Sequence, residues 1–498
     1  MSRSTPNVQQ TEGGRRLSRR GFLAVSTSGV VALAAGCGPA ATPPPTSAPK
    51  ADATAAPQGT QAPVPQTTPA PTPKATQAPV AAGSAKPFAG TSINVAAFTA
   101  PYTQNLSAYI PNFEQQTGIK VSYQTPAFAV YNQQADMELS TKGSAYDAAN
   151  ITFIYSSRWI GAGWFTPLDD YLKDANKTPA DWGATDWLPG GAKPFQDKKG
   201  LTYGFPFYTE PIIAGASRFD LIEKAGLKMP DTFDDMEKMC AAVNKKEDVY
   251  AYVNDNHFGW TWIGFLQGFG GNVFRNPPDD LMPTLDTPES IQAAEWFVNI
   301  IKKYTPDGML SYNDDSAMNS LFQGRANYWT FNANNLVQVG NPQKSKTAKT
   351  VNYSLFPAGP KGRFPQVASH GFGIPVGSKK KDAAWEFIKW ANSRELLQKM
   401  LVEKGYGGAP RRSVLSSPEY KKVMTANGVD VGDIYLKSLE MAGSGYMAYR
   451  TVHVYPQIDN QLNIAIARIA SNQLSAKDSM KQAQTDSIAE LKKGGINL

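Results

Sequence analysis

The sequence predicts an α/β fold in two lobes, each with a mainly parallel sheet flanked by helices. Two observations support this prediction. Strand and helix patterns alternate from about residue 91 onward, which is typical of parallel strands joined by helices that cover the sheet. The region with these patterns, residues 91–498, is too long for one hydrophobic core.

The first elements follow one another in regular order. "SINVAAF" alternates apolar and polar residues as a strand does, and so does "IKVSY" after Gly118. Between them, "NLSAYIPNFEQQTG" has apolar residues at helical spacing and ends at Gly118. A further helix through Met137 and Leu139 leads to the apolar run "NITFIY", which we interpret as the third strand. This alternation predicts a parallel sheet.

Helices later in the chain carry clear start signals and apolar stripes. Pro288 opens "PESIQAAEWFVNIIKKY", whose stripe includes Ile291, Val298 and Ile301. "DAAWEFIKWANSRELLQKML" repeats the pattern. In "DTFDDMEKMCAAVNKK", Cys240 falls on the apolar side of a predicted helix, so we expect a small core residue there.

Residues 1–36 have the order of a secretion signal. A basic region precedes the apolar stretch 22–35, which is short for a membrane span. "SRRGFL" resembles the twin-arginine export motif. "AAGC" resembles the lipobox of bacterial lipoproteins, which implies acylation of Cys37 and cleavage just before it, although Ala34 replaces the usual leucine. An uncleaved anchor helix or an unlipidated signal is the alternative.

Residues 37–90 form a linker rich in proline, alanine and threonine. They contain almost no large apolar side chain, so they cannot bury enough surface to fold, and their prolines favour extended segments. With Cys37 acylated, Cys240 has no partner for a disulfide within the chain. The folded body is therefore expected to begin near Thr91.

The net charge gives no sign of a nucleic-acid partner. The chain carries +7, but residues 1–36 hold five arginines and one glutamate, so the remainder carries +3. No dense basic run remains apart from Lys379 to Lys381, which we interpret as the solvated start of a helix. A surface suited to DNA or RNA is not expected.

Enzyme and cofactor motifs are absent from the sequence. His257, His370 and His453 match no metal-ligand spacing, and neither a G-x-S-x-G elbow nor a phosphate-binding loop occurs. We therefore expect no catalytic residue, no metal and no cofactor. Carboxylates are plentiful, so a glycosidase with paired carboxylates stays open, but the pattern favours a binding protein.

Aromatic and amide residues gather where loops are expected to follow strands. "FTAPYT", "FIYSSRW", "FPFYTEP", "HFGWTWIGFLQGFGG" and "YWTFNANN" are examples. Ligands of open parallel sheets bind at the carboxyl ends of strands. A flat ring can stack on the C–H face of a sugar while polar neighbours satisfy its hydroxyls. Many of these aromatics are expected in the core, but at least one of Trp260 and Trp262 is a candidate for lining a cleft.

Six segments, in this order, resemble the extracellular solute-binding proteins of ABC importers, in the large family that binds sugars and oligosaccharides. They are "FEQQTGIKVSYQ", "YDAANITFIYSSRWIGAGWFTPLDDYL", "YGFPFYTEPIIAGASRFDLIEKAGLKMPDTFDDM", "FQGRANYWTFNANN", "HGFGIPVGSKKKDAAWEFIKWANS" and "GYGGAPRRSVLSSPEY". The resemblance covers residues 91–498. One departure is Ala216-Ser217-Arg218, where the family usually has Tyr-Asn-Lys or Tyr-Arg-Lys.

The resemblance implies a two-lobed, periplasmic-binding-protein-like fold with the ligand enclosed between the lobes. It implies a monomer, exported and held by its lipid at the outer face of the cytoplasmic membrane, that delivers its ligand to a membrane permease. The expected ranges are 91–208 with 373–411 for the first lobe, and 212–370 with 413–498 for the second.

The resemblance also implies which residues contact the ligand. The candidates are Tyr102, Tyr155, Ser156, Tyr208, Glu210, Trp260, Trp262, Trp329, Asn332, Arg411, Arg450 and Tyr455. Either arginine could instead pair with a surface acid. Few basic groups among these residues favour a neutral sugar. The alternatives are the same fold with a phosphorylated polyol, a small anion or a peptide, and a secreted carbohydrate-active enzyme.

Overall fold

The structure is a computed structural model that describes residues 86–405 and 407–498. The predicted signal, Cys37 and most of the predicted linker lie outside the described residues. The described residues belong to one compact unit. Within the described part of the chain, every helix is too short or too polar to cross a bilayer.

One sheet of eight strands organises the described residues, in the order β2-β1-β3-β10-β4-β8-β5, with β9 also paired to β4. Its strands are β1 (Ser92–Ala96), β2 (Lys120–Gln124), β3 (Ala148–Thr152), β4 (Gly204–Ala216), β5 (Tyr250–Tyr252), β8 (Ala326–Asn332), β9 (Asn352–Ser354) and β10 (Val367–Gly373). Two separate ribbons are formed by β6 (Phe274–Asn276) with β7 (Asp280–Pro283), and by β11 (Thr425–Ala426) with β12 (Val429–Asp430).

Helices connect these strands. They are α1 (Pro101–Ser107), α2 (Ile110–Thr117), α3 (Phe128–Ser140), α4 (Phe153–Gly161), α5 (Asp169–Lys173), α6 (Pro189–Ala192), α7 (Phe219–Lys224), α8 (Phe233–Val243), α9 (Phe258–Thr261), α10 (Ile263–Phe269), α11 (Pro288–Tyr304), α12 (Asp314–Phe322), α13 (Ala333–Leu336), α14 (Lys381–Ala391), α15 (Arg394–Lys404), α16 (Arg412–Leu415), α17 (Pro418–Met424), α18 (Val431–Ala442), α19 (Tyr455–Ala470) and α20 (Ala476–Lys493). Short 3₁₀ segments add η2 (Lys193–Phe195) and η5 (Ala448–Thr451), among others.

The α/β fold is confirmed, but the sheet is mixed rather than mainly parallel. Parallel pairing joins β1 to β2 and β3, and β5 to β8. In the middle, β10 runs antiparallel to β3 and β4, and β4 runs antiparallel to β8. The two strands β4 and β10 add these antiparallel ladders, which the βαβ pattern of the first elements could not reveal.

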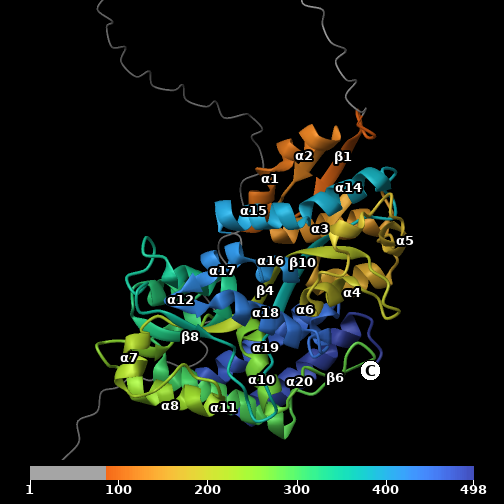
Figure 1. Cartoon of the computed structure of the whole chain (residues 1–498). Coiled ribbons are helices and arrows are strands. Elements are labelled where there is room, and N and C mark those ends of the chain that lie inside the picture. The colour runs from red at the N-terminus through yellow and green to blue at the C-terminus, as the bar shows by residue number, and fades with distance from the viewer. Residues whose placement is uncertain (1–85, 406) are drawn as a thin grey trace, which may run out of the picture. The chain divides into compact units, whose positions relative to one another are not determined.

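Strand β4 is the element that joins the two parts of the sheet. Its first half pairs with β10 as far as Pro211, and from Ile212 onward it pairs with β8. In Figure 1, β4 and β10 lie between the elements β1, α2 and α14 and the elements β8, α7 and α11. The change of partner falls inside the predicted boundary at residues 208–212; the lobe ranges themselves stay a prediction.

Local signals in the sequence explain several helix ends. Thr232 caps α8 by accepting a hydrogen bond from the Asp235 N–H at 3.1 Å, and the Asp235 carboxylate accepts the Thr232 N–H at 3.2 Å. Gly118 ends α2 with φ 79°, which a residue without Cβ adopts freely. Cys240 on α8 is completely buried, so its predicted place in the core is confirmed.

Two predicted boundaries are wrong. The run "NITFIY" is not one strand, because β3 ends at Thr152 and α4 begins at Phe153. A short apolar run cannot distinguish a strand from a buried helix, and here Phe153, Trp159 and Ile160 form the buried stripe of a helix. The helix predicted through "NLSAYIPNFEQQTG" is divided into α1 and α2, and Pro111 stands in the first turn of α2.

Candidate functional site

A chain of hydrogen bonds converges on Glu210, just before β4 changes partner. The Asn334 amide donates to the Tyr208 hydroxyl at 2.8 Å, and that hydroxyl donates to Glu210 Oε1 at 3.0 Å. Burial raises the pKa of Glu210 to about 7, with a smaller contribution from the nearby Asp314 carboxylate, although the Tyr208 hydrogen bond opposes it. At neutral pH the Glu210 carboxyl group can therefore either donate or accept a hydrogen bond.

Aromatic rings from both central strands pack beside Glu210. The rings of Tyr102 and Tyr208 stack with centroids 4.0 Å apart and planes 9° from parallel. His370 of β10 stands opposite Tyr208 in the strand register, and its ring lies 5.5 Å from that of Phe153. Burial, helped by the charge of Arg450, lowers the pKa of His370 to about 3, so its ring is neutral.

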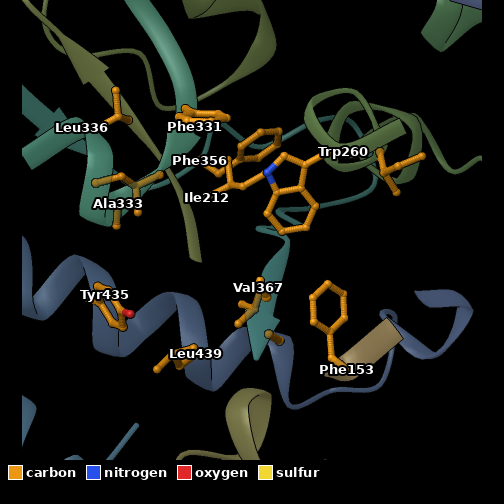
Figure 2. Packing of buried hydrophobic residues seen from close by; sticks show 14 of the residues in the cluster. Phe153, Ile212, Trp260, Phe331, Ala333, Leu336, Phe356, Val367, Tyr435 and Leu439 are labelled. Atoms are coloured by element: carbon orange, nitrogen blue, oxygen red, sulfur yellow. The ribbon is translucent and has the colours of Figure 1, made fainter. Parts of the chain in front are cut away.

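Arg450 lies against two aromatic rings that come from opposite sides of the sheet's centre. Its guanidinium carbon is 3.8 Å from the ring centroid of Trp260 on α9 and 4.7 Å from that of Phe153 on α4. Figure 2 shows Phe153 and Trp260 close to Val367 of β10. Trp260 in turn donates its indole N–H to Asn332 Oδ1 at 3.2 Å. We define the junction cluster as Tyr208, Glu210, Trp260, Asn332, Asn334 and Arg450.

A second buried carboxylate belongs to the same region. Asp255 is 3% exposed, and its Oδ1 accepts the His257 N–H at 3.0 Å. Burial raises the pKa of Asp255 to about 6, and the charge of Asp314 adds to that rise as it does for Glu210. The His257 ring meets Asp459 Oδ2 at 2.9 Å. The region thus offers several carboxylate and amide oxygens, which are the acceptors that hydroxyl groups need.

A cavity of about 660 Å³ adjoins the junction cluster and shares Arg450 with it. This volume suits a small molecule. The cavity is bounded by α4, by η2 and the segment after it, and by the chain around η5. Its lining residues are Phe153, Ser157, Ile160, Gly161, Gly190, Lys193, Pro194, Gln196, Asp197, Lys198, Lys199, Pro278, Val367, Ala442, Gly445, Met447, Ala448, Arg450 and Thr451.

Several predicted site residues are brought together at this place, far apart though they are in sequence. Tyr102 stacks on the junction cluster through Tyr208. Tyr455 lies near Arg450, with its ring centroid 5.7 Å from the guanidinium carbon, but it is only 2% exposed and donates its hydroxyl to Gly259 O at 2.9 Å, so it packs in the core beside the cluster. The other predicted residues that gather here are Tyr208, Glu210, Trp260, Asn332 and Arg450.

Three residues that the sequence predicts as ligand contacts lie in the core instead. Trp262 has no exposed surface, and its indole donates to a backbone carbonyl of α11. Trp329 is equally buried, because the strand β8 is covered on both faces. Its ring stacks on that of Phe331 with the centroids 3.9 Å apart. Arg411 is 1% exposed and lies on two tryptophan rings beside Asp186, so it is a structural residue.

Two predicted site residues, Tyr155 and Ser156, lie on α4 but do not line the cavity. Ser156 is buried and donates its hydroxyl to Phe153 O at 2.9 Å. Tyr155 is half-buried and stacks on Trp159. Because the segment is helical, the cavity is lined by Phe153 and other residues of a different face. A helical reading of "FIYSSRW" would have identified that face.

Sequence reasoning missed four residues of this region. Phe153 was placed at a strand end, and Asn334, Asp255 and His370 were not selected as ligand contacts. Asn334 lies two residues after Asn332 in "FNANN", and His370 is the first residue of "HGFGIPVG". The position of His370 opposite Tyr208 depends on strand pairing, so no local signal could have found it.

Known proteins resemble this chain over most of its length. A family model described as bacterial extracellular solute-binding protein matches residues 96–396. The mannitol-binding protein of Pseudomonas aeruginosa is 24% identical over 382 residues, which cover 74% of this chain and 85% of the relative. A solute-binding protein of Agrobacterium radiobacter K84, solved in complex with ribitol, has a TM-score of 0.68 at 20% identity and covers 81% of this chain and 99% of its own. The sugar-binding protein MalE of Xanthomonas citri has a TM-score of 0.68 at 17% identity, over 81% and 98% of the two chains.

Proposed function

This chain belongs to the bacterial extracellular solute-binding protein family, and from that premise we propose that it captures a sugar or polyol for an ABC importer. It has the mixed α/β fold of periplasmic binding proteins and is a transport component, not an enzyme. The carboxylates of the site therefore bind the ligand and do not cleave it. The bound ligand is delivered unchanged to the membrane permease.

The junction cluster is the observation that carries this proposal. It lies where β4 changes partner from β10 to β8, so side chains from both parts of the sheet meet there. Glu210, Asn332 and Asn334 supply carboxylate and amide groups, which can accept from and donate to successive hydroxyls. A ligand held there would contact both parts of the sheet and favour the form in which they close on it.

A polyol or a small sugar suits this site better than a long oligosaccharide. Stacking of sugar rings requires a free aromatic face, but Arg450 lies 3.8 Å from the centroid of the Trp260 ring and covers one face of it. Glu210, Asn332 and Asn334 bring carboxylate and amide groups to this place, which favours ligands recognised mainly through hydroxyls. The mannitol-binding relative and the ribitol complex named above support the same choice.

A thermal-shift screen tests this proposal. The protein would be heated with hexitols, pentitols, monosaccharides and maltose-type oligosaccharides, each recovered afterwards and checked for intactness. A ligand at a hundredfold excess over its Kd adds about 2.7 kcal/mol of stability. The exposed Glu223→Gln variant is the matched control for Glu210→Gln, which should lose the shift. If no sugar or polyol of this set, and none of their carboxylate or phosphate derivatives, raised the midpoint, the assignment would be refuted.

We also propose that the protein is a monomer anchored at the outer face of the cytoplasmic membrane through a lipid on Cys37. The twin-arginine-like and lipobox-like motifs support this proposal. The Cys37→Ala variant should leave the membrane fraction and appear in the soluble extracytoplasmic fraction. Equal membrane retention of the variant and the wild-type protein would contradict lipid anchoring.

A further inference from the structure

The start of helix α4 lacks a side-chain cap. Thr152 is the N-cap residue, yet its side chain makes no capping hydrogen bond. The Thr152 hydroxyl is buried and has no hydrogen-bond partner among the described residues. The first turn of a helix presents unpaired N–H groups and the positive end of the helix dipole. Such a helix start favours a negatively charged group.

Arg450 provides an independent indication of an anion-binding site at the same place. Its side chain is 5% exposed and lines the cavity. Nε and Nη1 of its guanidinium have no hydrogen-bond partner among the described residues. The guanidinium lies over the ring of Phe153, the first residue of α4. Burying a charged group without a partner is costly, so this arrangement indicates that an external anion completes it.

The carboxylates of the region do not meet this need. Asp459, on the neighbouring α19, bonds the His257 ring at 2.9 Å. Glu210 bonds the Tyr208 hydroxyl. Among the described residues, Arg450 forms no ion pair within 4.0 Å.

The rim of the cavity is also basic. Lys193, Lys198 and Lys199 line it together with one acidic residue, Asp197, and Lys198 pairs with Asp279 just outside the lining. Asp197 is held by the backbone N–H groups of Lys199 and Leu201 at 2.8 and 2.9 Å. Positive groups at the mouth of a cavity attract anionic ligands and speed their association.

We propose that the ligand is an anionic sugar or polyol, in which a carboxylate or phosphate binds Arg450 at the start of α4 while the hydroxyls bind the rest of the junction cluster. This inference rests on the proposed function and deepens it. It departs from the neutral sugar that the sequence favours, because the sequence does not show that Arg450 lies in the site without a carboxylate partner.

Isothermal titration calorimetry tests the inference with matched probes. D-mannitol is the neutral probe, D-mannonate carries a carboxylate, D-mannitol 1-phosphate carries a phosphate, and inorganic phosphate lacks the polyol. The test variants are Arg450→Gln and the charge-conserving Arg450→Lys. Arg412→Gln is the matched control, since Arg412 pairs with Glu440 at 2.6 Å and both side chains are about half exposed. Thermal denaturation of each variant reports whether it is folded.

We expect one of the two anionic probes to bind at least tenfold more tightly than mannitol, and to show which anion is preferred. Arg450→Gln should weaken that probe about thirtyfold or more, while mannitol changes less than threefold. Arg450→Lys should retain part of the preference, and Arg412→Gln all of it. If Arg450→Gln does not fold, the inference is tested by the affinities of Arg450→Lys and by the ratio of the Kd values of the neutral and anionic probes in the wild-type protein.

The other outcomes separate the two proposals. Mannitol binding as tightly as both anionic probes would overturn the anionic inference and leave the proposed function intact. Inorganic phosphate binding as tightly as mannitol 1-phosphate would show that the polyol chain is not recognised, which overturns both. A preference for an anionic probe that Arg450→Gln does not reduce would refute the role of Arg450.

Discussion

The raised pKa of Glu210 makes the stability of the ligand-free protein depend on pH in a defined direction. The pKa of this carboxyl is 4.5 in the unfolded chain and about 7 in the folded protein, where burial disfavours its charge. Between these two values the folded state binds the proton and the unfolded state has lost it. The free energy of unfolding must therefore fall as the pH rises from about 4.5 to about 7, and stay level above that.

The magnitude follows from the difference between the two pKa values. Each pKa unit corresponds to 1.36 kcal/mol, so Glu210 lowers the free energy of unfolding by at most about 3 kcal/mol at pH 8 relative to pH 4. Glu210→Gln removes this penalty, because the amide has a similar shape and still accepts the Tyr208 hydroxyl but never ionises. The free energy of unfolding of the variant should therefore increase relative to that of the wild-type protein as the pH rises.

Urea denaturation of the wild-type protein and Glu210→Gln at pH 4, 5, 6, 7 and 8 measures this directly. The difference in free energy between the two proteins isolates Glu210, since Asp255 and every other titrating group is common to both. Glu223→Gln, a change at an exposed carboxylate, is the control and should give no such gain. A difference for Glu210→Gln that is constant within about 0.5 kcal/mol across the series would refute the reasoning.

Three other predictions concern residues that the structure assigns to the core. Trp262→Ala should lower the free energy of unfolding by about 3 to 5 kcal/mol, whereas Trp262→Phe should keep ligand affinity unchanged, as calorimetry can check. Arg411→Met should cost about 3 kcal/mol in a urea titration, because the hydrogen bonds from Arg411 to two backbone carbonyls and its pairing with Asp186 are lost; an unchanged midpoint would contradict this. Burial raises the pKa of the Cys240 thiol, so a thiol reagent at pH 8 should modify Cys240 only after unfolding, with Cys240→Ser as the reference.

Patterns within a few neighbouring residues predicted those helices and strands whose position depends on interactions between neighbours in the sequence. The strand β1, the helix α11 and the end of α2 at Gly118 follow from periodicity and from start and stop signals. The boundary between β3 and α4 was missed, since a strand and a buried helix are equally apolar over a few residues. As a consequence, Phe153 lines the cavity, whereas the predicted residues Tyr155 and Ser156 lie on other faces of α4.

The candidate site was predicted less well than the fold. Loop position, residue type and the family resemblance selected Glu210, Trp260 and Arg450, which the structure places in one region; their contact with a ligand stays a prediction. The same criteria also selected Trp262 and Trp329, because residue type alone does not distinguish a tryptophan in a core from a tryptophan in a cleft. Trp262 and Trp329 have no exposed surface, whereas Trp260 keeps 7% and carries Arg450 on its ring. This small difference depends on neighbouring elements and is not a local property.

The sequence by itself determined that this chain is an exported-type α/β protein with helices and strands at recognisable places, and it identified the family. The tertiary structure alone decided that β4 exchanges β10 for β8 beside Glu210, and that Arg450 lies between Trp260 and Phe153. Periodicity and capping act over a few residues, whereas these contacts join residues more than a hundred positions apart. Their geometry depends on how the packed elements meet.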